Sequence, residues 1–295
     1  MQVIGEYRSR HEVFKGLQRA KCQQCGLVSA SPMPSETSLR EYNQAYFANA
    51  HGGESTDKNA LAFFQSIAAI RMRHVENYLQ KNCKEPKSIL EIGPGKGYLA
   101  RSWLLKYPEI DYYALESDSS CHTSLKKFGV NVLGNDDMPE PASIDLIIMS
   151  HVLEHVGDPL NQLEECISWL KNGGVIFLEV PCRDWAHKQE DEPHVLFFEK
   201  EAMDYLLSRL NLQKIRLTYH GKKLRDLRRF PKIKNLISRV RFKLISFGIV
   251  KPFAISGPDR SLIKEPLQRA VIKPYKAHLE SEEPAWWLRA MACKP

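Results

Sequence analysis

Residues Leu90-Glu91-Ile92-Gly93-Pro94-Gly95-Lys96-Gly97 join a short apolar run to a glycine-rich turn. The run 88–92 has the length and composition of a buried strand, and the glycines allow positive φ angles and a close approach of a ligand to the backbone. The spacing is Gly-x-Gly-x-Gly, and no Gly-Lys-Ser/Thr follows it. The dinucleotide fingerprint and the phosphate-binding loop therefore both fit poorly.

Helix and strand patterns alternate on both sides of this turn. Apolar spacing and turn residues predict helices over 61–79, 97–107, 119–128, 159–171 and 199–210, and strands over 88–92, 111–116, 130–133, 144–149, 175–180 and 213–219. Strands separated by helices indicate an α/β fold with a doubly wound, mostly parallel sheet and helices on both of its faces.

Glu116 ends the strand that is predicted to follow the glycine turn, and it lies 23 residues beyond Gly93. A carboxylate at the switch point of a doubly wound sheet can accept hydrogen bonds from both hydroxyl groups of a ribose. The turn and the acid together predict a nucleoside-containing ligand across the carboxyl ends of the strands.

Further motifs follow in the order found in a known family. They are Ser-His-Val-Leu-Glu-His-Val at 150–156, Leu-Lys-Asn-Gly-Gly at 170–174 and Pro-His-Val-Leu-Phe-Phe at 193–198. With 90–97 and Glu116, they resemble class I S-adenosylmethionine-dependent methyltransferases of the small-molecule, polysaccharide-pathway type. The resemblance covers about residues 60–220 and implies a Rossmann-like sheet of seven strands.

The same resemblance implies which residues bind S-adenosylmethionine. The three glycines of the turn would pass close to the methionine part, Glu116 would hold the ribose, and the loop 135–138 would flank the adenine, with Asn135 or Asp136 at its amino group. The full implied set is Glu91, Gly93, Gly95, Gly97, Tyr98, Glu116, Ser117, Asn135, Asp136, Met138 and Ser150.

Histidine and glutamate gather after the strand 144–149, at the edge where open α/β sheets bind ligands. His151, Glu154 and His155 follow that strand, and His194 follows the next one. Three interpretations stay open. In the first, Glu154 and His155 cap the next segment. In the second, His151 or His155 is the general base for a hydroxyl acceptor. In the third, the site binds a divalent metal ion through His151, Glu154, His155 and His194.

Two similar subfamilies bear on the metal. The ubiquinone-pathway O-methyltransferases and the small-RNA terminal-ribose methyltransferases hold a divalent ion with a Glu-x-x-Glu-His cluster. This chain keeps Glu154 and His155 but has His151 in place of the first glutamate. The exchange of a carboxylate for an imidazole favours a softer ion than magnesium.

The resemblance implies methyl transfer to an oxygen of a small or carbohydrate-like acceptor. A second interpretation is ribose methylation of RNA with metal assistance, and a third is a cofactor-binding protein without turnover. The chain lacks an appended RNA-binding module and a basic surface interleaved with aromatic residues, which argues against a nucleic-acid partner. Nothing in the sequence indicates an oligomeric state.

Residues 1–60 are expected to form an amino-terminal cap before the core at 61–220. Cys22 and Cys25 form one Cys-x-x-Cys pair in a segment that resembles an amino-terminal region carrying two zinc-binding pairs in relatives. Only His11 offers a further upstream ligand, and tetrahedral zinc needs four, so a degenerate knuckle without metal is expected. The aromatic stretch Tyr42, Tyr46 and Phe47 is expected to cover the cofactor.

The last strand of the sheet is predicted at the end of the chain. Class I methyltransferase sheets finish with an antiparallel pair, yet only 213–219 follows the helix at 199–210. The run Ala-Trp-Trp-Leu-Arg-Ala-Met-Ala at 285–292 is the best candidate for the missing strand, within a final segment 285–295. Residues 221–284 are then an insertion beside the substrate mouth.

The net charge of +7 is concentrated in one place. Residues 214–243 hold twelve Lys and Arg and one acid, a segment charge of +11, which leaves −4 for the rest of the chain. A solvated surface, a phosphate-bearing acceptor and an anionic surface all fit such a segment. Apolar and basic residues alternate over 236–245, which fits either a helix packed on the domain or peripheral membrane contact through 221–250.

The composition, with 43% hydrophobic and 26% charged residues, is that of an ordinary globular protein and excludes fibrous and disordered classes. No apolar signal segment follows Met1, and no run reaches membrane-spanning length. Seven cysteines at scattered positions fit reduced thiols. These features predict a cytoplasmic protein, either free or peripheral to the inner face of the membrane.

Overall fold

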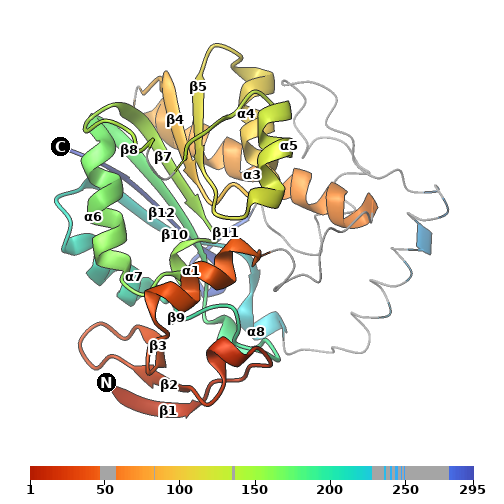
Figure 1. The fold of residues 1–295 in the computed structure, drawn as a ribbon, viewed down its shortest axis with the longest axis vertical. Coiled ribbons are helices and arrows are strands. Elements are labelled where there is room, and N and C mark those ends of the chain that lie inside the picture. The colour runs from red at the N-terminus through yellow and green to blue at the C-terminus, as the bar shows by residue number, and fades with distance from the viewer. Residues whose placement is uncertain are drawn as a thin grey trace.

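The structure is a computed structural model of the 295-residue chain. It describes residues 1–46, 58–82, 84–134, 137–227 and 279–295, and the single positions Leu236, Val240, Lys243, Leu244, Phe247 and Ile249. The described residues form an eight-stranded central sheet and a four-stranded sheet near the amino terminus (Figure 1).

Helices alternate with the strands of the central sheet along the chain. The elements in order are α3 (Lys58–Lys81), β4 (Ser88–Ile92), α4 (Tyr98–Lys106), β5 (Asp111–Leu115), the 3-10 turn η2 (Ser119–Cys121), α5 (His122–Lys127), β6 (Asn131–Val132), β7 (Ile144–Ser150), η3 (Leu153–His155), α6 (Pro159–Trp169), β8 (Leu170–Pro181), η4 (Asp184–Ala186), α7 (Lys200–Ser208), β10 (Gln213–Lys223), α8 (Leu224–Leu227), β11 (Glu280–Ser281) and β12 (Ala285–Cys293).

The strand order of the central sheet is β11-β10-β12-β8-β7-β4-β5-β6. The strands from β8 to β6 pair in parallel, whereas β12 runs antiparallel to both of its neighbours, β8 and β10. The predicted α/β fold with a doubly wound, mostly parallel sheet is confirmed. The carboxyl ends of β4, β5, β7 and β8 consequently lie along one edge of the sheet, and the candidate residues follow them.

Neighbouring residues of the central strands pack into different cores, one on each face of the sheet. Leu90 belongs to the core that includes Leu163 of α6 and Leu206 of α7, whereas Ile89 belongs to the core that includes Val75 of α3 and Leu99 of α4. Since successive side chains of a strand point to opposite faces, continuous apolar runs are what a sheet covered on both sides requires.

The predicted count of seven strands is wrong, because β11 adds an eighth. Its two residues pair with Tyr219 and His220 of β10. Strand β10 runs to Lys223, beyond the predicted end at 219, and in this extension His220 and Lys223 pair with β12. A two-residue partner has no hydrophobic pattern that a sequence could reveal.

The predicted boundary between α6 and β8 is also wrong. The helix ends at Trp169 instead of 171, and the strand begins at Leu170 instead of 175. The backbone amide of Gly173 donates to Lys294 O and that of Lys294 donates to Gly174 O, both at 2.9 Å. The end of the chain thus extends β8 through a glycine pair that otherwise signals a turn.

The predicted last strand is confirmed as β12. Leu288 pairs with Val180 of β8 on one side and with Tyr219 of β10 on the other. Of the segment between β10 and β12, residues 228–278 lie outside the described residues apart from the single positions above. The assignment of 221–284 as an insertion stays a prediction.

The amino-terminal sheet has the order β1-β2-β3-β9. Its first three strands are β1 (Gln2–Glu6), β2 (Gln18–Lys21) and β3 (Val28–Ser31), followed by α1 (Glu36–Gln44), while β9 (Leu196–Phe197) comes from the middle of the chain. Phe14 belongs to the 3-10 turn η1 (Glu12–Phe14). Phe14 and Tyr7 share one core with Leu178 and Leu288 of the central sheet. Residues 1–46 are therefore joined to the rest of the described chain by pairing with β9 and by a common core.

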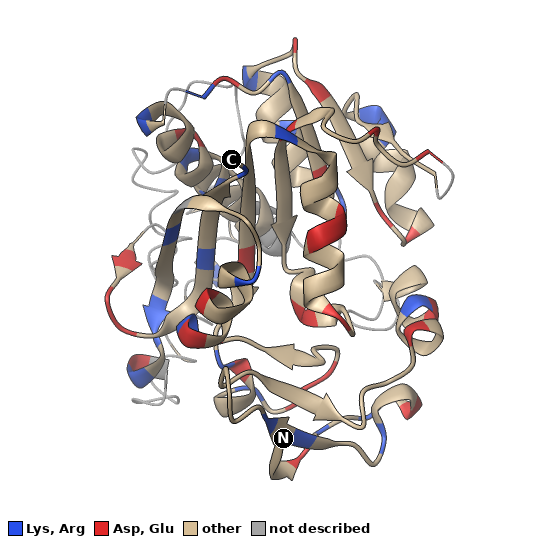
Figure 2. Ribbon diagram, turned by 90° about the vertical axis from the view of Figure 1, so that its left-hand side faces the viewer, with Lys and Arg blue, Asp and Glu red and all other residues tan. Residues whose placement is uncertain are grey.

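Charged residues of both signs are interspersed over the described elements (Figure 2). Among the described residues, no helix combines the length and the apolar character that crossing a membrane requires. Leu236, Val240 and Phe247 are each more than half exposed.

Candidate functional site

The glycine turn leads from β4 into α4 and has a backbone that glycine alone adopts readily. Gly93, Gly95 and Gly97 have φ angles of 64°, 57° and 74°. A Cβ atom at Gly93 would lie 2.6 Å from Cγ2 of Val152, and one at Gly97 would lie 2.7 Å from Cδ2 of Leu125. Positive φ thus favours glycine at all three positions, and crowding adds to this at Gly93 and Gly97.

Glu116 lies directly after β5 and is bonded to the turn. Its carboxylate accepts hydrogen bonds from the backbone amides of Gly95, at 2.8 Å, and Asp118, at 2.9 Å. Burial raises the pKa of Glu116 above its ordinary value, although both amides oppose this rise. The glycine turn and the carboxylate predicted to hold a ribose are therefore one hydrogen-bonded unit.

Glu91 lies beneath the turn and is buried. Its carboxylate accepts a hydrogen bond of 2.7 Å from the hydroxyl of Tyr112, and burial raises its pKa to about 7. Tyr98 begins α4, and its ring stacks on that of Phe64 at a centroid distance of 6.2 Å. These contacts support the turn from below and from one side.

The other predicted cofactor residues are spread along the same edge. Ser117 is exposed and donates to the carbonyl of Asn43 at 3.4 Å, and Met138 is exposed. Ser150 donates to Glu179 Oε1 at 3.3 Å. Asn135 and Asp136 lie outside the described residues.

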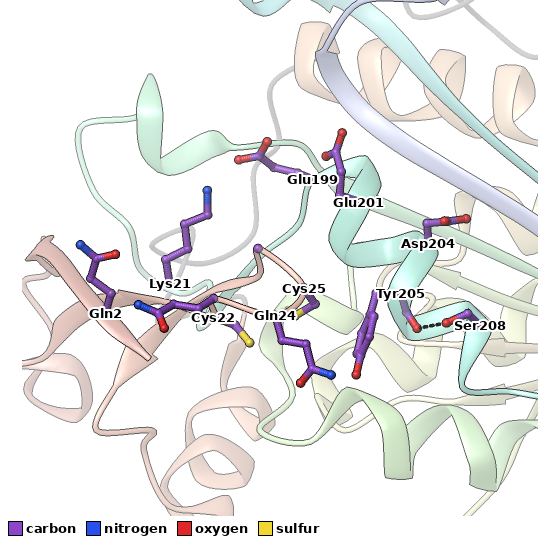
Figure 3. A pocket seen from close by; sticks show the side chains of 12 residues that line it. Gln2, Lys21, Cys22, Gln24, Cys25, Glu199, Glu201, Asp204, Tyr205 and Ser208 are labelled. Carbon is purple, nitrogen blue, oxygen red and sulfur yellow. Dashed lines mark hydrogen bonds between the residues drawn. The ribbon is translucent and has the colours of Figure 1, made fainter.

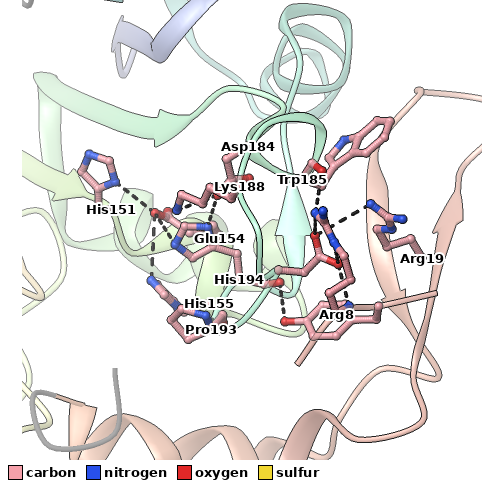
Figure 4. A network of polar contacts seen from close by, with 12 residues as sticks. Arg8, Arg19, His151, Glu154, His155, Asp184, Trp185, Lys188, Pro193 and His194 are labelled. Carbon is pink, nitrogen blue, oxygen red and sulfur yellow. Dashed lines mark hydrogen bonds and ion pairs between the residues drawn. The ribbon is translucent and has the colours of Figure 1, made fainter. Parts of the chain in front are cut away.

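A second group of polar residues lies at the ends of β7 and β8 (Figure 4). His151 follows β7 with a φ of 58°, and Glu154 and His155 belong to η3, while His194 lies in the loop before β9. The structure places the ligand atoms of Glu154, His155 and His194 within 4.8 Å of one another. His151 is not a member of this three-residue group.

The two histidines of the group have their Nδ1 atoms engaged. Nδ1 of His155 lies 3.2 Å from the carbonyl oxygen of Pro193, and Nδ1 of His194 lies 2.5 Å from Oδ2 of Asp184. Since both partners are acceptors, each Nδ1 carries the proton and each Nε2 carries a lone pair. Burial lowers the pKa of His155 to about 4, so its ring is neutral at neutral pH.

The lone pairs converge on Glu154, which is 1% exposed. Its Oε1 lies 4.0 Å from Nε2 of His155 and 3.9 Å from Nε2 of His194. Among the described residues, the two carboxylate oxygens of Glu154 have no hydrogen-bond partner. The same holds for Nε2 of His155. Apart from the contact of His151 with Glu154 Oε1, these buried atoms have no neighbouring donor among the described residues.

His151 has a different environment. Its Nδ1 lies 3.2 Å from Glu154 Oε1 and its Nε2 lies 3.2 Å from Glu179 Oε1. Burial lowers the pKa of this imidazole, but the two carboxylates outweigh burial and raise it above its ordinary value. The geometry favours a protonated, charged His151 that bridges the two carboxylates. A protonated imidazole cannot accept a further proton.

Glu179 is a site residue that the sequence analysis missed. It is fully buried and bonded to Arg71 of α3 and Arg289 of β12, each at 2.6 Å. Burial opposes its ionisation, yet the two guanidinium groups hold its pKa well below the ordinary value. An acid within the apolar run 175–180 was the signal that could have revealed it.

The capping interpretation of Glu154 and His155 is not supported. Asp158 caps α6 instead, with Oδ1 accepting from the backbone amides of Leu160 and Asn161 at 3.1 Å. Glu154 and His155 point into the polar group described above (Figure 4).

Cys22 and Cys25 lie at the turn between β2 and β3 and line a pocket of about 830 Å³ with Glu199, Glu201 and Asp204 (Figure 3). Backbone amides of Cys25 and Gln24 lower the pKa of Cys22. Among the described residues, no third ligand joins the two thiols in a metal-binding group. The degenerate knuckle without metal stays a prediction.

The comparisons with known proteins agree with this fold. The model of a methyltransferase domain family matches residues 64–227, more than half of the chain, and the chain belongs to this family. It is therefore an enzyme of the methyltransferase class. A search of curated proteins found no match.

Solved structures show the same fold at low sequence identity. The plantazolicin methyltransferase BpumL, in complex with a monoazolic desmethylPZN analog and SAH, is 16% identical, with 87% of this chain and 95% of that chain covered and a TM-score of 0.51. A SAM-dependent methyltransferase from Archaeoglobus fulgidus is 16% identical, with 84% of this chain and 98% of that chain covered and a TM-score of 0.50.

Proposed function

We propose that the protein transfers a methyl group from S-adenosylmethionine to an oxygen of a small or carbohydrate-like acceptor. The glycine turn fits the donor because its positive φ angles and the crowding around it exclude side chains. Glu116 fits the donor because its carboxylate lies at the switch point of the sheet, bonded to the turn. The observation that carries the choice of oxygen is the neutral His155, whose Nε2 has no partner.

The chain's own residues position the acceptor and take its proton. When bound, S-adenosylmethionine supplies an already activated methyl group, so that orientation provides most of the acceleration. A hydroxyl acceptor must also lose its proton, which an amine lone pair does not require for attack. His155 Nε2 accepts that proton, and Glu154 stabilises the imidazolium that forms.

A divalent cation is a second means of activating the same hydroxyl. Glu154, His155 and His194 would hold it, since they offer one carboxylate and two Nε2 lone pairs within 4.8 Å. Such a donor set suits zinc or iron better than magnesium, and the ion would lower the pKa of a hydroxyl bound to it. Glu154 Oε2, which has no hydrogen-bond partner among the described residues, favours this arrangement.

The basic segment supports an acceptor that bears phosphate or is carried on an anionic surface. Residues 214–243 have a charge of +11, and Leu236, Val240 and Phe247 are exposed. We infer peripheral contact with a membrane from the same features.

A screen with labelled donor tests the proposal. Nucleotide sugars, glycans, phenols and an RNA oligonucleotide are offered as acceptors, with and without a chelator, and S-adenosylhomocysteine binding is measured by thermal shift. Transfer to a hydroxyl of a small acceptor is expected. Methylated RNA would favour the RNA interpretation, binding without transfer to any acceptor would favour a scaffold, and turnover unchanged by chelators would exclude the cation.

A further inference from the structure

The loop between β8 and β9, residues 183–195, carries both Asp184 and His194. Residues that lie outside the matched methyltransferase domain hold this loop in place by hydrogen bonds. Its partners are residues 7–11 and β3, which lie more than 150 positions earlier in the chain. Figure 4 shows these partners on the opposite side of the loop from Glu154 and His155.

Arg8 is the centre of this attachment. Its Nη2 donates to Asp191 Oδ1 at 2.6 Å and its Nε donates to Oδ2 at 3.2 Å, which makes a two-pronged pair. The backbones add two bonds, from the amide of Arg8 to Asp191 Oδ2 at 2.7 Å and from the amide of Asp191 to Arg8 O at 2.8 Å. Nη2 of Arg8 also donates to the carbonyl of Trp185 at 2.6 Å.

Asp191 is buried, with a fully covered side chain, and Arg8 is its nearest charged partner. The next nearest cation is Arg19, whose Nη1 lies 3.8 Å from Asp191 Oδ1. A buried carboxylate that loses its main partner is strongly unfavourable, and a loop relieves this by moving the carboxylate toward water.

His194 follows Asp191 in the same turn. Its backbone amide donates to Asp191 O at 3.1 Å, and its carbonyl accepts from the hydroxyl of Tyr7 at 2.9 Å. The neighbouring Val195 donates to Glu154 O and accepts from the amide of Ala30 in β3, both at 2.8 Å. The backbone of His194 is thus held between the amino-terminal sheet and η3.

We propose that Arg8 is a positioning residue for the acceptor side of the active site, acting through Asp191 to hold the His194 loop against Glu154. This inference rests on the proposed function, in which Glu154, His155 and His194 activate the acceptor. It assigns to the amino-terminal sheet a part in acceptor chemistry and none in cofactor binding.

Replacing Arg8 tests the proposal, with Arg10 as a matched control. Arg10 lies in the same segment, but its side chain is 81% exposed and pairs with Glu190 at the surface. In Arg8→Ala we expect kcat for the acceptor found by the screen to fall at least tenfold, while S-adenosylhomocysteine affinity stays within twofold of wild type. Arg8→Lys should recover part of the rate, and Arg10→Ala should match wild type.

Two measurements do not need an acceptor and separate this proposal from the proposed function. Hydrogen exchange in the S-adenosylhomocysteine complex should become faster over 183–195 in Arg8→Ala and in no other segment around the site. The ring signal of His194, assigned in NMR spectra with His194→Gln, should shift in Arg8→Ala and not in Arg10→Ala. Unchanged exchange and an unchanged ring signal would overturn the proposal, as would equal losses of turnover and cofactor affinity. Absence of turnover in the wild type, with both effects present, would contradict only the proposed function.

Discussion

The proposed cofactor side and the proposed acceptor side of the site are built in different ways. The glycine turn and Glu116, the centre of the proposed cofactor side, lie within one strand-helix-strand unit, and the carboxylate of Glu116 accepts hydrogen bonds from backbone amides. The acceptor side draws residues from η3, the loop before β9 and the amino-terminal strands, and its contacts are mainly between side chains. A local unit can be read from spacing, whereas a site assembled from distant segments depends on the whole fold. Four changes would break or sharpen this contrast.

The largest effect is expected for Gly93→Ala. Positive φ costs a residue with a Cβ atom roughly 1–2 kcal/mol, and that atom would also lie 2.6 Å from Val152 Cγ2. We expect affinity for S-adenosylhomocysteine to fall about 100-fold, measured by calorimetry. Gly129→Ala is the control, because its φ is also positive, 86°, but the nearest side-chain atom is 4.0 Å away. Equal affinities in the two variants would contradict the prediction.

Glu154→Gln should separate the two sides. The change removes the charge that faces His155 and His194, so turnover should fall at least about tenfold, while affinity for S-adenosylhomocysteine is unchanged. The exposed Glu164 of α6 provides the control variant Glu164→Gln. Equal loss of cofactor affinity and turnover in Glu154→Gln would show that the two sides are not independent.

Glu91→Gln should change how stability depends on pH. The pKa of Glu91 is raised from 4.5 to about 7 in the folded protein, so this group stabilises the fold while protonated and loses that contribution as pH rises through 7. Between pH 5 and pH 8 the wild type should lose about 2 kcal/mol more unfolding free energy than the variant. Urea unfolding at both pH values measures the difference, and parallel pH profiles would count against it.

The smallest effect is expected for Arg225→Ala. This side chain is 66% exposed and pairs with Glu283 at 2.9 Å, so little stability depends on it. If the basic segment attracts a phosphate-bearing acceptor, KM should rise about twofold at low salt and less at high salt. Arg228→Ala and Arg229→Ala should add to this rise. An unchanged KM at low salt would favour a merely solvated surface.

The strands of the sheet and the turn that carries the proposed cofactor side could be predicted closely from the sequence, because both depend on local patterns. The strand 88–92 has the predicted bounds, and Glu116 lies where a strand end was expected. The last strand was found because a sheet of this kind needs a partner for β10. In contrast, β11 was missed because two residues carry no periodicity.

On the acceptor side the residues were found but their roles were not. His151, Glu154, His155 and His194 were grouped, yet only the last three have ligand atoms within 4.8 Å of one another. His151 contacts Glu154 and also Glu179, which is buried and bonded to Arg71 and Arg289. Such a long-range charge network leaves no spacing rule in the sequence, and neither does the pair of Arg8 and Asp191.

The position of β12 in the sheet has a consequence during synthesis. Residues 285–293 lie between β8 and β10 in the sheet. A nascent chain that has already synthesised β8 and β10 therefore still lacks the strand that pairs with both of them. Until residues 285–293 leave the ribosome, the buried apolar strand β8 presents an unpaired edge, which is a site for aggregation. We therefore expect the central sheet to close only after β12 has been synthesised and released from the ribosome.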